Sequence, residues 1–105
     1  MPQNRLDQLL QLLSEDPLDP FLLYAVAIER MSAADPLAIA CFEELLNLHP
    51  DYLPTYYTYA GLLAQQGADT KARTLLEAGS RLAQQQGNQK ALNEIRQALN
   101  LLDDE

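Results

Sequence analysis

Apolar residues recur along this chain with the spacing of an α-helix. Glycine and proline cluster near positions 16–20, 35–36, 50–54, 67 and 87, and they divide the chain into six segments. In five segments the apolar side chains follow the i, i+3, i+7 pattern, as at Leu6, Leu9 and Leu13. The remaining segment is apolar on nearly all sides over 21–28, so it must be covered on more than one face. No stretch alternates with period two, and the pattern therefore predicts about six helices and no strands.

Capping residues mark the expected helix boundaries. Acidic residues stand at three expected starts, Asp19, Asp35 and Asp69, and a proline directly follows the first two. An aspartate can cap the first free N–H groups, and proline fits the first helical position. At the other end, Gly67 and Gly87 are expected to close helices in the left-handed conformation.

The chain also repeats itself. A shift of 34 residues places Pro20 on Pro54 and Phe42 on Leu76, and other apolar positions coincide in the same register. A period of this length indicates stacked helical units, each of which buries its apolar face against a neighbour.

Residues 19–52 and 53–86 resemble two tetratricopeptide repeats. The first carries Ala38, Phe42 and Pro50 at the family's spacing for the second helix of a repeat. The second matches the family on its first helix, with Tyr56, Tyr59, Ala60, Leu63 and Gly67. The chain departs from the pattern in two places, since Glu29 stands where a large apolar residue is usual and Gln84 replaces the closing proline.

The resemblance implies an all-α fold, a short right-handed α-solenoid of antiparallel helix pairs with about six helices. We expect one domain over residues 1–105. Its parts are an N-terminal helix at 3–15, repeat 1 at 19–52, repeat 2 at 53–86, a C-terminal capping helix at 88–102 and a fraying tail at 103–105. The flanking helices would cover the end faces that two repeats alone leave open.

Composition narrows the classes of function. The 105 residues carry 15 acidic and 7 basic side chains, a formal charge of -8. This balance argues against nucleic acid and against an anionic membrane surface as partners. One cysteine excludes an intramolecular disulfide, and the N-terminal residues lack the apolar stretch of a signal peptide, so we expect a cytoplasmic protein.

Candidate catalytic residues are few. His49 is the only histidine and has no ligand or base partner at a useful spacing, while Cys41 lies on an apolar stripe, where a thiol is inert. The adjacent Glu43 and Glu44 point about 100° apart on a helix and do not form an acid–base pair. We therefore expect no enzyme, no cofactor and no metal site.

In the family, the first helix of each repeat builds most of the inner concave surface. The resemblance places twelve residues there: Pro20, Leu23, Tyr24, Ala27, Arg30, Met31, Pro54, Tyr57, Thr58, Gly61, Ala64 and Gln65. A carboxylate clamp, one binding mode of the family, needs Lys, Asn and Arg at several of these positions, and Arg30 is the sole cation among them. The groove is instead apolar and aromatic, unless Leu23, Tyr24 and Tyr57 simply fill the core.

The sequence thus indicates a non-enzymatic protein–protein interaction module that binds a peptide segment or a partner helix. The alternative is a structural or self-associating scaffold subunit, and we expect a monomer with a weak homodimer as the other option. Charge adds a hypothesis. Residues 1–53 carry nine acidic and two basic groups, while residues 54–105 carry six and five. The acidic half could steer a basic partner or meet another copy head-to-tail, or these charges are ordinary solvated faces.

Overall fold

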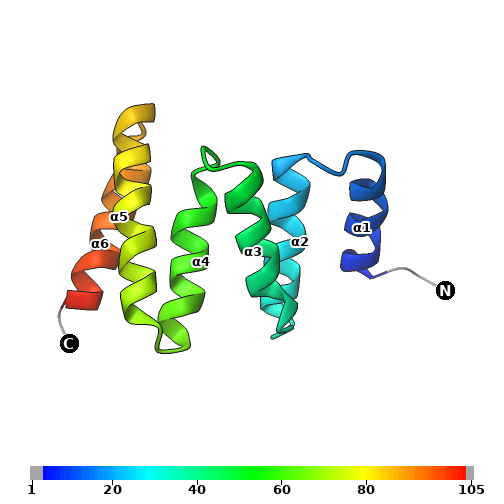
Figure 1. Cartoon of the computed structure of the whole chain (residues 1–105), viewed down its shortest axis with the longest axis horizontal. Coiled ribbons are helices and arrows are strands. Elements are labelled where there is room, and N and C mark those ends of the chain that lie inside the picture. Colours follow the sequence, from blue (N-terminus) through cyan, green and yellow to red (C-terminus); the bar gives the residue numbers. More distant parts are fainter. Residues whose placement is uncertain (1–3, 104–105) are drawn as a thin grey trace. The chain divides into compact units, whose positions relative to one another are not determined.

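The computed structural model describes residues 4–103, and within them it contains six α-helices and no strand (Figure 1). This confirms the expected all-α class. The helices are α1 (Arg5–Glu15), α2 (Pro20–Ser32), α3 (Leu37–Leu48), α4 (Pro54–Gln65), α5 (Asp69–Gln86) and α6 (Gln89–Asp103).

Asp19 caps α2 as expected, whereas the cap position of α3 is Pro36 and not Asp35, so this proline precedes the first helical residue, Leu37. Both aspartates nevertheless accept a hydrogen bond from the start of the helix that follows. The Asp19 carboxylate accepts a hydrogen bond from the Phe21 backbone N–H at 2.8 Å, and the Asp35 carboxylate accepts one from the Leu37 N–H at 2.9 Å. The expectation for Asp69 is wrong, because this residue is already the first of α5 and its side chain makes no capping bond. Ala68, one residue earlier, takes the cap position, and it has no side chain that could accept a hydrogen bond.

Gly67 and Gly87 end α4 and α5 in the left-handed conformation, as expected, with φ of 82° and 67°. In each turn the N–H after the glycine bonds back to a carbonyl five residues earlier, which satisfies groups that a helix end leaves free. The end of α2 has the same hydrogen-bond pattern, but its left-handed residue is Ala34, with φ of 54°.

The chain forms two compact units, unit 1 (Met1–Tyr52) and unit 2 (Leu53–Glu105). The division falls at the position where the two repeats were expected to meet. In unit 1, α2 packs against both α1 and α3. Its core contains Leu9, Leu23, Val26, Ala27, Ala38, Phe42 and Leu45.

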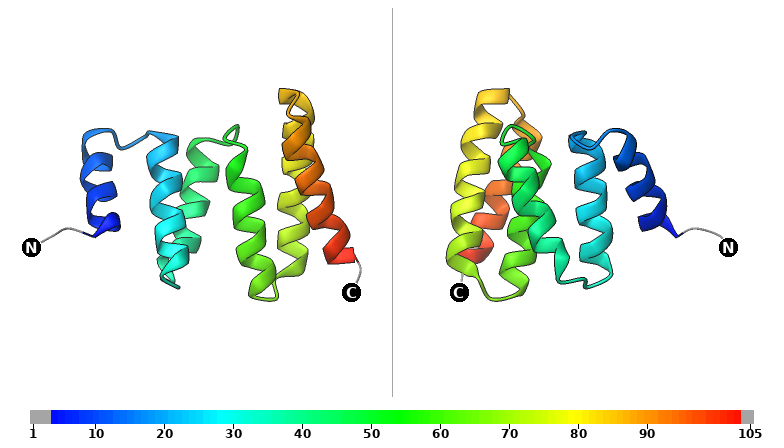
Figure 2. Two further views of the ribbon diagram at one scale, coloured as in Figure 1. Left: turned by 180° about the vertical axis from the view of Figure 1, so that it is seen from behind. Right: turned by 45° about the vertical axis from the view of Figure 1, so that its right-hand side comes forward.

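In unit 2, α5 packs against both α4 and α6 (Figure 2). Its core contains Tyr59, Ala60, Leu63, Ala72, Leu76, Ala83, Leu92 and Ile95. The contact between α4 and α5 is tight at Gly79, where an added Cβ would lie 2.8 Å from the Cβ of Tyr56.

The helix ends differ slightly from the expected ranges. The last helix reaches Asp103, which was expected to begin the frayed tail, and the Arg73 guanidinium on α5 donates a hydrogen bond to its carboxylate. This ion pair joins the end of α6 to α5. The first helix begins at Arg5, and the expectations for residues 3, 104 and 105 lie outside the described part of the chain.

Candidate functional site

A groove of about 330 Å³ opens in unit 2 between α4 and α6, with α5 forming part of its wall. Figure 2 shows α4 and α6 running alongside α5. The lining residues are Tyr57, Ala60, Gly61 and Ala64 from α4, Leu76 from α5, and Ala98, Leu101 and Leu102 from α6.

Small residues on α4 keep this groove open. Ala60, Gly61 and Ala64 fall on one side of the helix, and no atom lies within 4 Å of the place where a Cβ on Gly61 would stand. Tyr57 and Leu101 remain exposed over 46% and 72% of their surfaces. Because the Tyr57 hydroxyl is the one polar side-chain group in the lining, the groove can bury apolar side chains but offers no acid–base pair.

Three of the expected binding residues on α4, Tyr57, Gly61 and Ala64, line this groove together. The other three, Pro54, Thr58 and Gln65, do not line it. Sequence reasoning missed the contribution of α5 and α6. A signal was present on α6, because Leu101 is a large apolar residue outside the apolar stripe that packs this helix on α5.

The expected residues on α2 are placed differently in unit 1. Leu23 is 8% exposed and Ala27 is 0% exposed, so both belong to the core and offer almost no surface to a partner. Tyr24 is half-buried, and its ring packs on that of Tyr52 in a T-shaped arrangement with the ring centroids 5.6 Å apart. Burial raises the pKa of the Tyr52 phenol. Leu23 therefore fills the core, which is the alternative considered for it, and Ala27 belongs to the core as well.

Arg30 has a structural contact. Its Nη1 donates a hydrogen bond to the Asp35 carboxylate at 2.9 Å, across the turn between α2 and α3. The Leu37 backbone N–H, supported by this guanidinium, holds the pKa of Asp35 below its usual value. The cation that was expected in the groove thus already neutralises a capping carboxylate, and Met31 beside it is half-buried.

The two candidate catalytic residues, His49 and Cys41, contribute to the structure of unit 1. The His49 Nε2 donates to the Leu18 carbonyl oxygen at 2.6 Å, which ties the end of α3 to the loop between α1 and α2. Cys41 is half-buried, and burial raises the pKa of its thiol, so the reactive thiolate is disfavoured. Among residues 4–103, no group of three or more His, Cys, Asp and Glu side chains could hold a metal ion.

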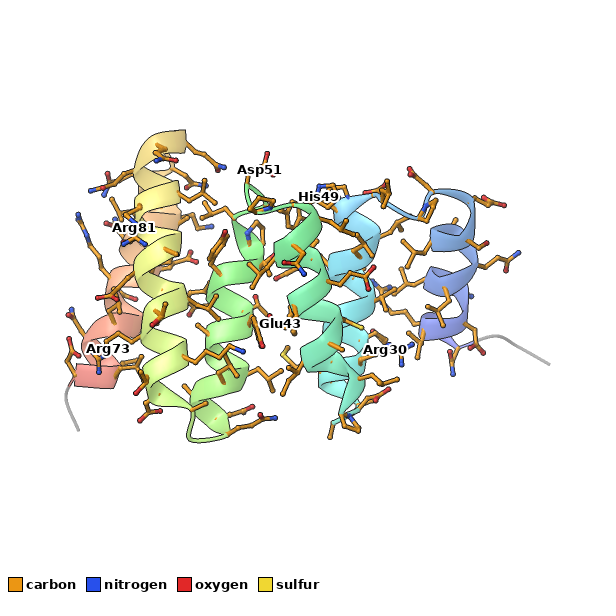
Figure 3. All side chains as sticks on the ribbon, viewed as in Figure 1. Arg30, Glu43, His49, Asp51, Arg73 and Arg81 are labelled. Carbon is orange, nitrogen blue, oxygen red and sulfur yellow. The ribbon has the colours of Figure 1, made fainter. Side chains whose placement is uncertain are left out.

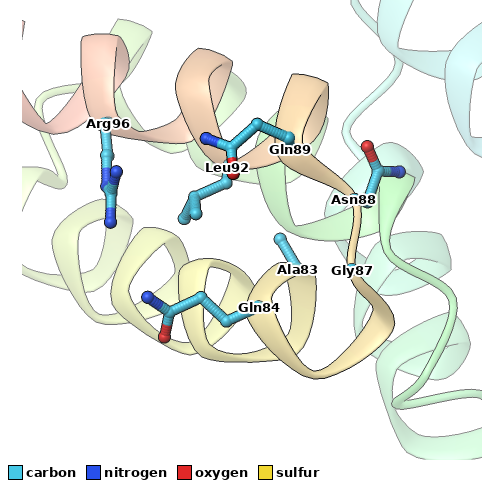
Figure 4. Close-up of a pocket in the computed structure, with 7 residues that line it drawn as sticks. All are labelled: Ala83, Gln84, Gly87, Asn88, Gln89, Leu92 and Arg96. Carbon is cyan, nitrogen blue, oxygen red and sulfur yellow. The ribbon is translucent and has the colours of Figure 1, made fainter.

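A second hollow in unit 2, of about 280 Å³, lies at the turn between α5 and α6 (Figure 4). Its polar side chains are amides and one guanidinium, contributed by Gln84, Asn88, Gln89 and Arg96. These groups include no nucleophile and no general base. None of the helices within residues 4–103 is long and apolar enough to cross a membrane.

The sequence model of the tetratricopeptide repeat matches residues 36–93, which is more than half of the chain. The chain belongs to the tetratricopeptide repeat family. The resemblance drawn from the repeat of 34 residues is therefore confirmed.

Solved structures agree with this assignment. A tetratricopeptide repeat domain protein from Salinibacter ruber is 33% identical in its crystal structure, with a TM-score of 0.77, and the match covers 82% of this chain and 97% of that one. Its solution structure gives 34% identity and a TM-score of 0.79, covering 84% and 90%. A protein from Bordetella parapertussis shares the fold at 21% identity, with a TM-score of 0.84 and coverage of 98% and 90%.

These neighbours confirm the all-α helical-repeat class, that of the α-solenoids. No curated protein is similar enough to this tetratricopeptide repeat chain to count as a relative.

Proposed function

We propose that this tetratricopeptide repeat chain is a non-enzymatic protein–protein interaction module that binds a peptide segment or a partner helix in the groove between α4 and α6. Repeats of this family generally serve as protein–protein interaction modules, and membership of the family supports that general role for this chain. The observation that carries the finer proposal is the groove itself, which is apolar and open and is flanked by the exposed Tyr57 and Leu101.

The chemistry of the lining supports an apolar ligand. Exposed aromatic side chains beside a pocket are typical anchors of protein interfaces. The small Ala60, Gly61 and Ala64 allow the backbone of a ligand to approach α4 closely. Since no charged side chain lines the groove, binding would depend on apolar burial, at about 25 cal/mol per Å². We place this function in the cytoplasm, with a protein partner and no nucleic acid, cofactor or metal.

The test begins with a displayed library of helical and extended peptides, selected on the purified chain. For a selected peptide, we expect Tyr57→Ala to weaken binding by about tenfold or more, as truncation of an interface anchor does. Gly61→Leu should weaken it as well, because the new side chain occupies the groove. Leu37→Ala, at an equally exposed leucine of unit 1, is the matched control and should leave the affinity unchanged.

Sedimentation equilibrium separates this proposal from the self-associating alternative. A mass that stays monomeric across protein concentrations supports a ligand groove. A dimer that Tyr57→Ala dissociates would show that the same apolar face joins copies of the chain, and it would overturn the proposal.

A further inference from the structure

At one end of unit 1, the loop between α1 and α2 lies beside the C-terminal end of α3 (Figure 1). Large apolar side chains are exposed at this end. Leu18 and Phe21 expose 60% and 66% of their surfaces, and Leu48 exposes 42%. The hydrogen bond from His49 to the Leu18 carbonyl holds this end of α3 against the loop. We call the three exposed side chains, Leu18, Phe21 and Leu48, the loop-end patch.

Several carboxylates belong to the same end of unit 1 as the loop-end patch. Three acidic residues belong to the end of α1 and the loop that follows it: Glu15, Asp16 and Asp19. Two of the three helix termini at this end are C-terminal, those of α1 and α3, and the partial charge of a helix C-terminus is negative. The surface therefore combines apolar side chains with a strongly negative rim.

The basic side chains of unit 1 lie elsewhere. Within residues 4–52 there are two, Arg5 and Arg30. Arg5 pairs with Glu29 at 3.4 Å and Arg30 pairs with Asp35 at 2.9 Å. In Figure 3, Arg30 lies toward the opposite end of unit 1 from His49. Neither guanidinium neutralises the rim of the loop-end patch.

We propose that the loop-end patch docks a cationic amphipathic segment of a partner protein. An apolar side chain of that segment packs on Leu18 and Phe21, and its flanking Lys or Arg side chains face Glu15, Asp16 and Asp19. Charge complementarity of this kind accelerates the encounter and fixes the orientation of the segment. Polyphosphates and anionic membranes carry the same sign as the rim and are repelled.

This site differs from the groove of unit 2 in the ligand that it selects. The groove has no charged lining residue and accepts a ligand by apolar fit. The loop-end patch also requires positive charge on the ligand, so a ligand with acidic flanks is rejected even when its apolar residues are the same. The two sites can therefore be tested independently.

The probe is an acetylated amphipathic peptide in which leucine pairs alternate with lysine pairs, labelled for fluorescence anisotropy. Its partner is the same peptide with glutamate in place of lysine. We expect the lysine peptide to bind at low ionic strength and to weaken as salt is added, because screening shortens the reach of exposed charges to about 10 Å at 0.1 M. The glutamate peptide should not bind.

The charge of the rim is tested by the triple variant Glu15→Gln/Asp16→Asn/Asp19→Asn. Asparagine caps a helix as well as aspartate, so Asp19→Asn keeps the start of α2. We expect the affinity for the lysine peptide to fall by about tenfold at low salt, the sum of three modest exposed pairs. The matched control is Asp69→Asn/Glu77→Gln/Glu94→Gln, which removes the same charge from unit 2 and should leave the affinity unchanged.

The apolar part is tested by Leu18→Gln/Phe21→Gln, with Leu37→Gln as the control at an equally exposed leucine near the N-terminal end of α3. The double variant should lose most of the affinity and the control should lose none. Far-ultraviolet circular dichroism and a thermal melt confirm that each variant folds. If the double variant does not fold, the charge triple decides the question alone.

Several results would overturn the proposal. If the glutamate peptide binds as tightly as the lysine peptide, the ligand needs no positive charge. If the control triple loses as much affinity as the Glu15, Asp16 and Asp19 triple, net charge acts without a defined site. Weakening by Tyr57→Ala would place the lysine peptide in the groove of unit 2. Self-association that Leu18→Gln/Phe21→Gln abolishes, measured by sedimentation equilibrium, would make the occupant another copy of the chain.

Discussion

At the scale of single residues, Ala34 has a left-handed backbone conformation, which is strained for a residue with a Cβ. It is the one non-glycine residue with a positive φ among residues 4–103. A left-handed conformation costs an ordinary residue about 1–2 kcal/mol, because its Cβ crowds the following carbonyl. The hydrogen bonds from Ala34 and Asp35 to the last turn of α2 hold the residue in place.

Ala34→Gly should therefore stabilise the protein. Glycine relieves the crowding but gives the unfolded chain more freedom, so we expect a net rise of about 0.5 kcal/mol in the free energy of unfolding. The control is Ala33→Gly, one residue earlier, where φ is −87° and there is nothing to relieve. That variant should be less stable than the parent in urea denaturation, and equal effects at the two positions would contradict the explanation.

The contrast with the two glycines shows what can be predicted for one residue. Gly67 and Gly87 identify the left-handed turns directly, because glycine is the residue that such a turn favours. Ala34 carries no such signal, and only the hydrogen bonds of the folded turn reveal it. The prediction that Asp69 caps α5 was wrong by one residue, because the helix already begins at Asp69.

At the scale of elements, the pair of α4 and α5 depends on the absence of a side chain at Gly79. A Cβ there would lie 2.8 Å from the Cβ of Tyr56 and 3.3 Å from the Cδ1 of Ile95. The Cβ of Tyr56 cannot move without its backbone, so the contact is not relieved by rotation of a side chain. Gly61 also lies inside a helix, but no atom lies within 4 Å of the position of an added Cβ there.

Gly79→Ala and Gly61→Ala should therefore shift stability in opposite directions. Alanine gains about 1 kcal/mol over glycine in a helix interior, and Gly61→Ala should show this gain. At Gly79 overpacking costs about 1–3 kcal/mol, so the net effect should be a loss of about 1 kcal/mol. Thermal and urea denaturation of both variants measure the difference, and a stabilised Gly79→Ala would show that α4 and α5 separate without strain.

Helix periodicity predicted the elements well and their exposed faces less well. On α4, three of the six expected binding residues line the groove. α2 is apolar nearly all around, so its spacing could not show that Leu23 and Ala27 face the core. Only the packing of α2 between α1 and α3 distinguishes its faces.

At the scale of the whole molecule, charge is distributed unevenly along the chain. Most of the formal charge of -8 comes from residues 1–53, where nine acidic groups face two basic ones. Excess charge of one sign destabilises a folded state through repulsion, and added salt weakens that repulsion.

Reversal of one charge in each half should show the asymmetry. Glu44 is exposed on α3 and has no charged residue three or four positions away, so Glu44→Lys should raise the free energy of unfolding by about 0.3 kcal/mol. Glu77 stands four residues from both Arg73 and Arg81, so Glu77→Lys should lower it by a similar amount. Urea denaturation at low salt measures both shifts, and they should shrink at high salt.

The family was accessible from the sequence because the same spacing occurs twice, and each copy supports the assignment of the other. The candidate binding surfaces were harder to predict from the sequence. The groove needs Leu101 and Leu76 beside Tyr57, and the loop-end patch needs the end of α3 beside the loop that contains Leu18, which no local pattern connects. Such sites arise from contacts between segments distant in the chain.

The fit of Tyr56 against Gly79 also bears on how the two hairpins could have diverged from one ancestor. In the register of 34 residues, their counterparts are Leu22 and Leu45. At these two positions the first hairpin has two leucines, and the second hairpin has a tyrosine and a glycine. Exchange of a single helix between the hairpins would set Tyr56 against Leu45, or leave a hole between Leu22 and Gly79. Recombination that preserves folding must therefore transfer both helices of a hairpin together.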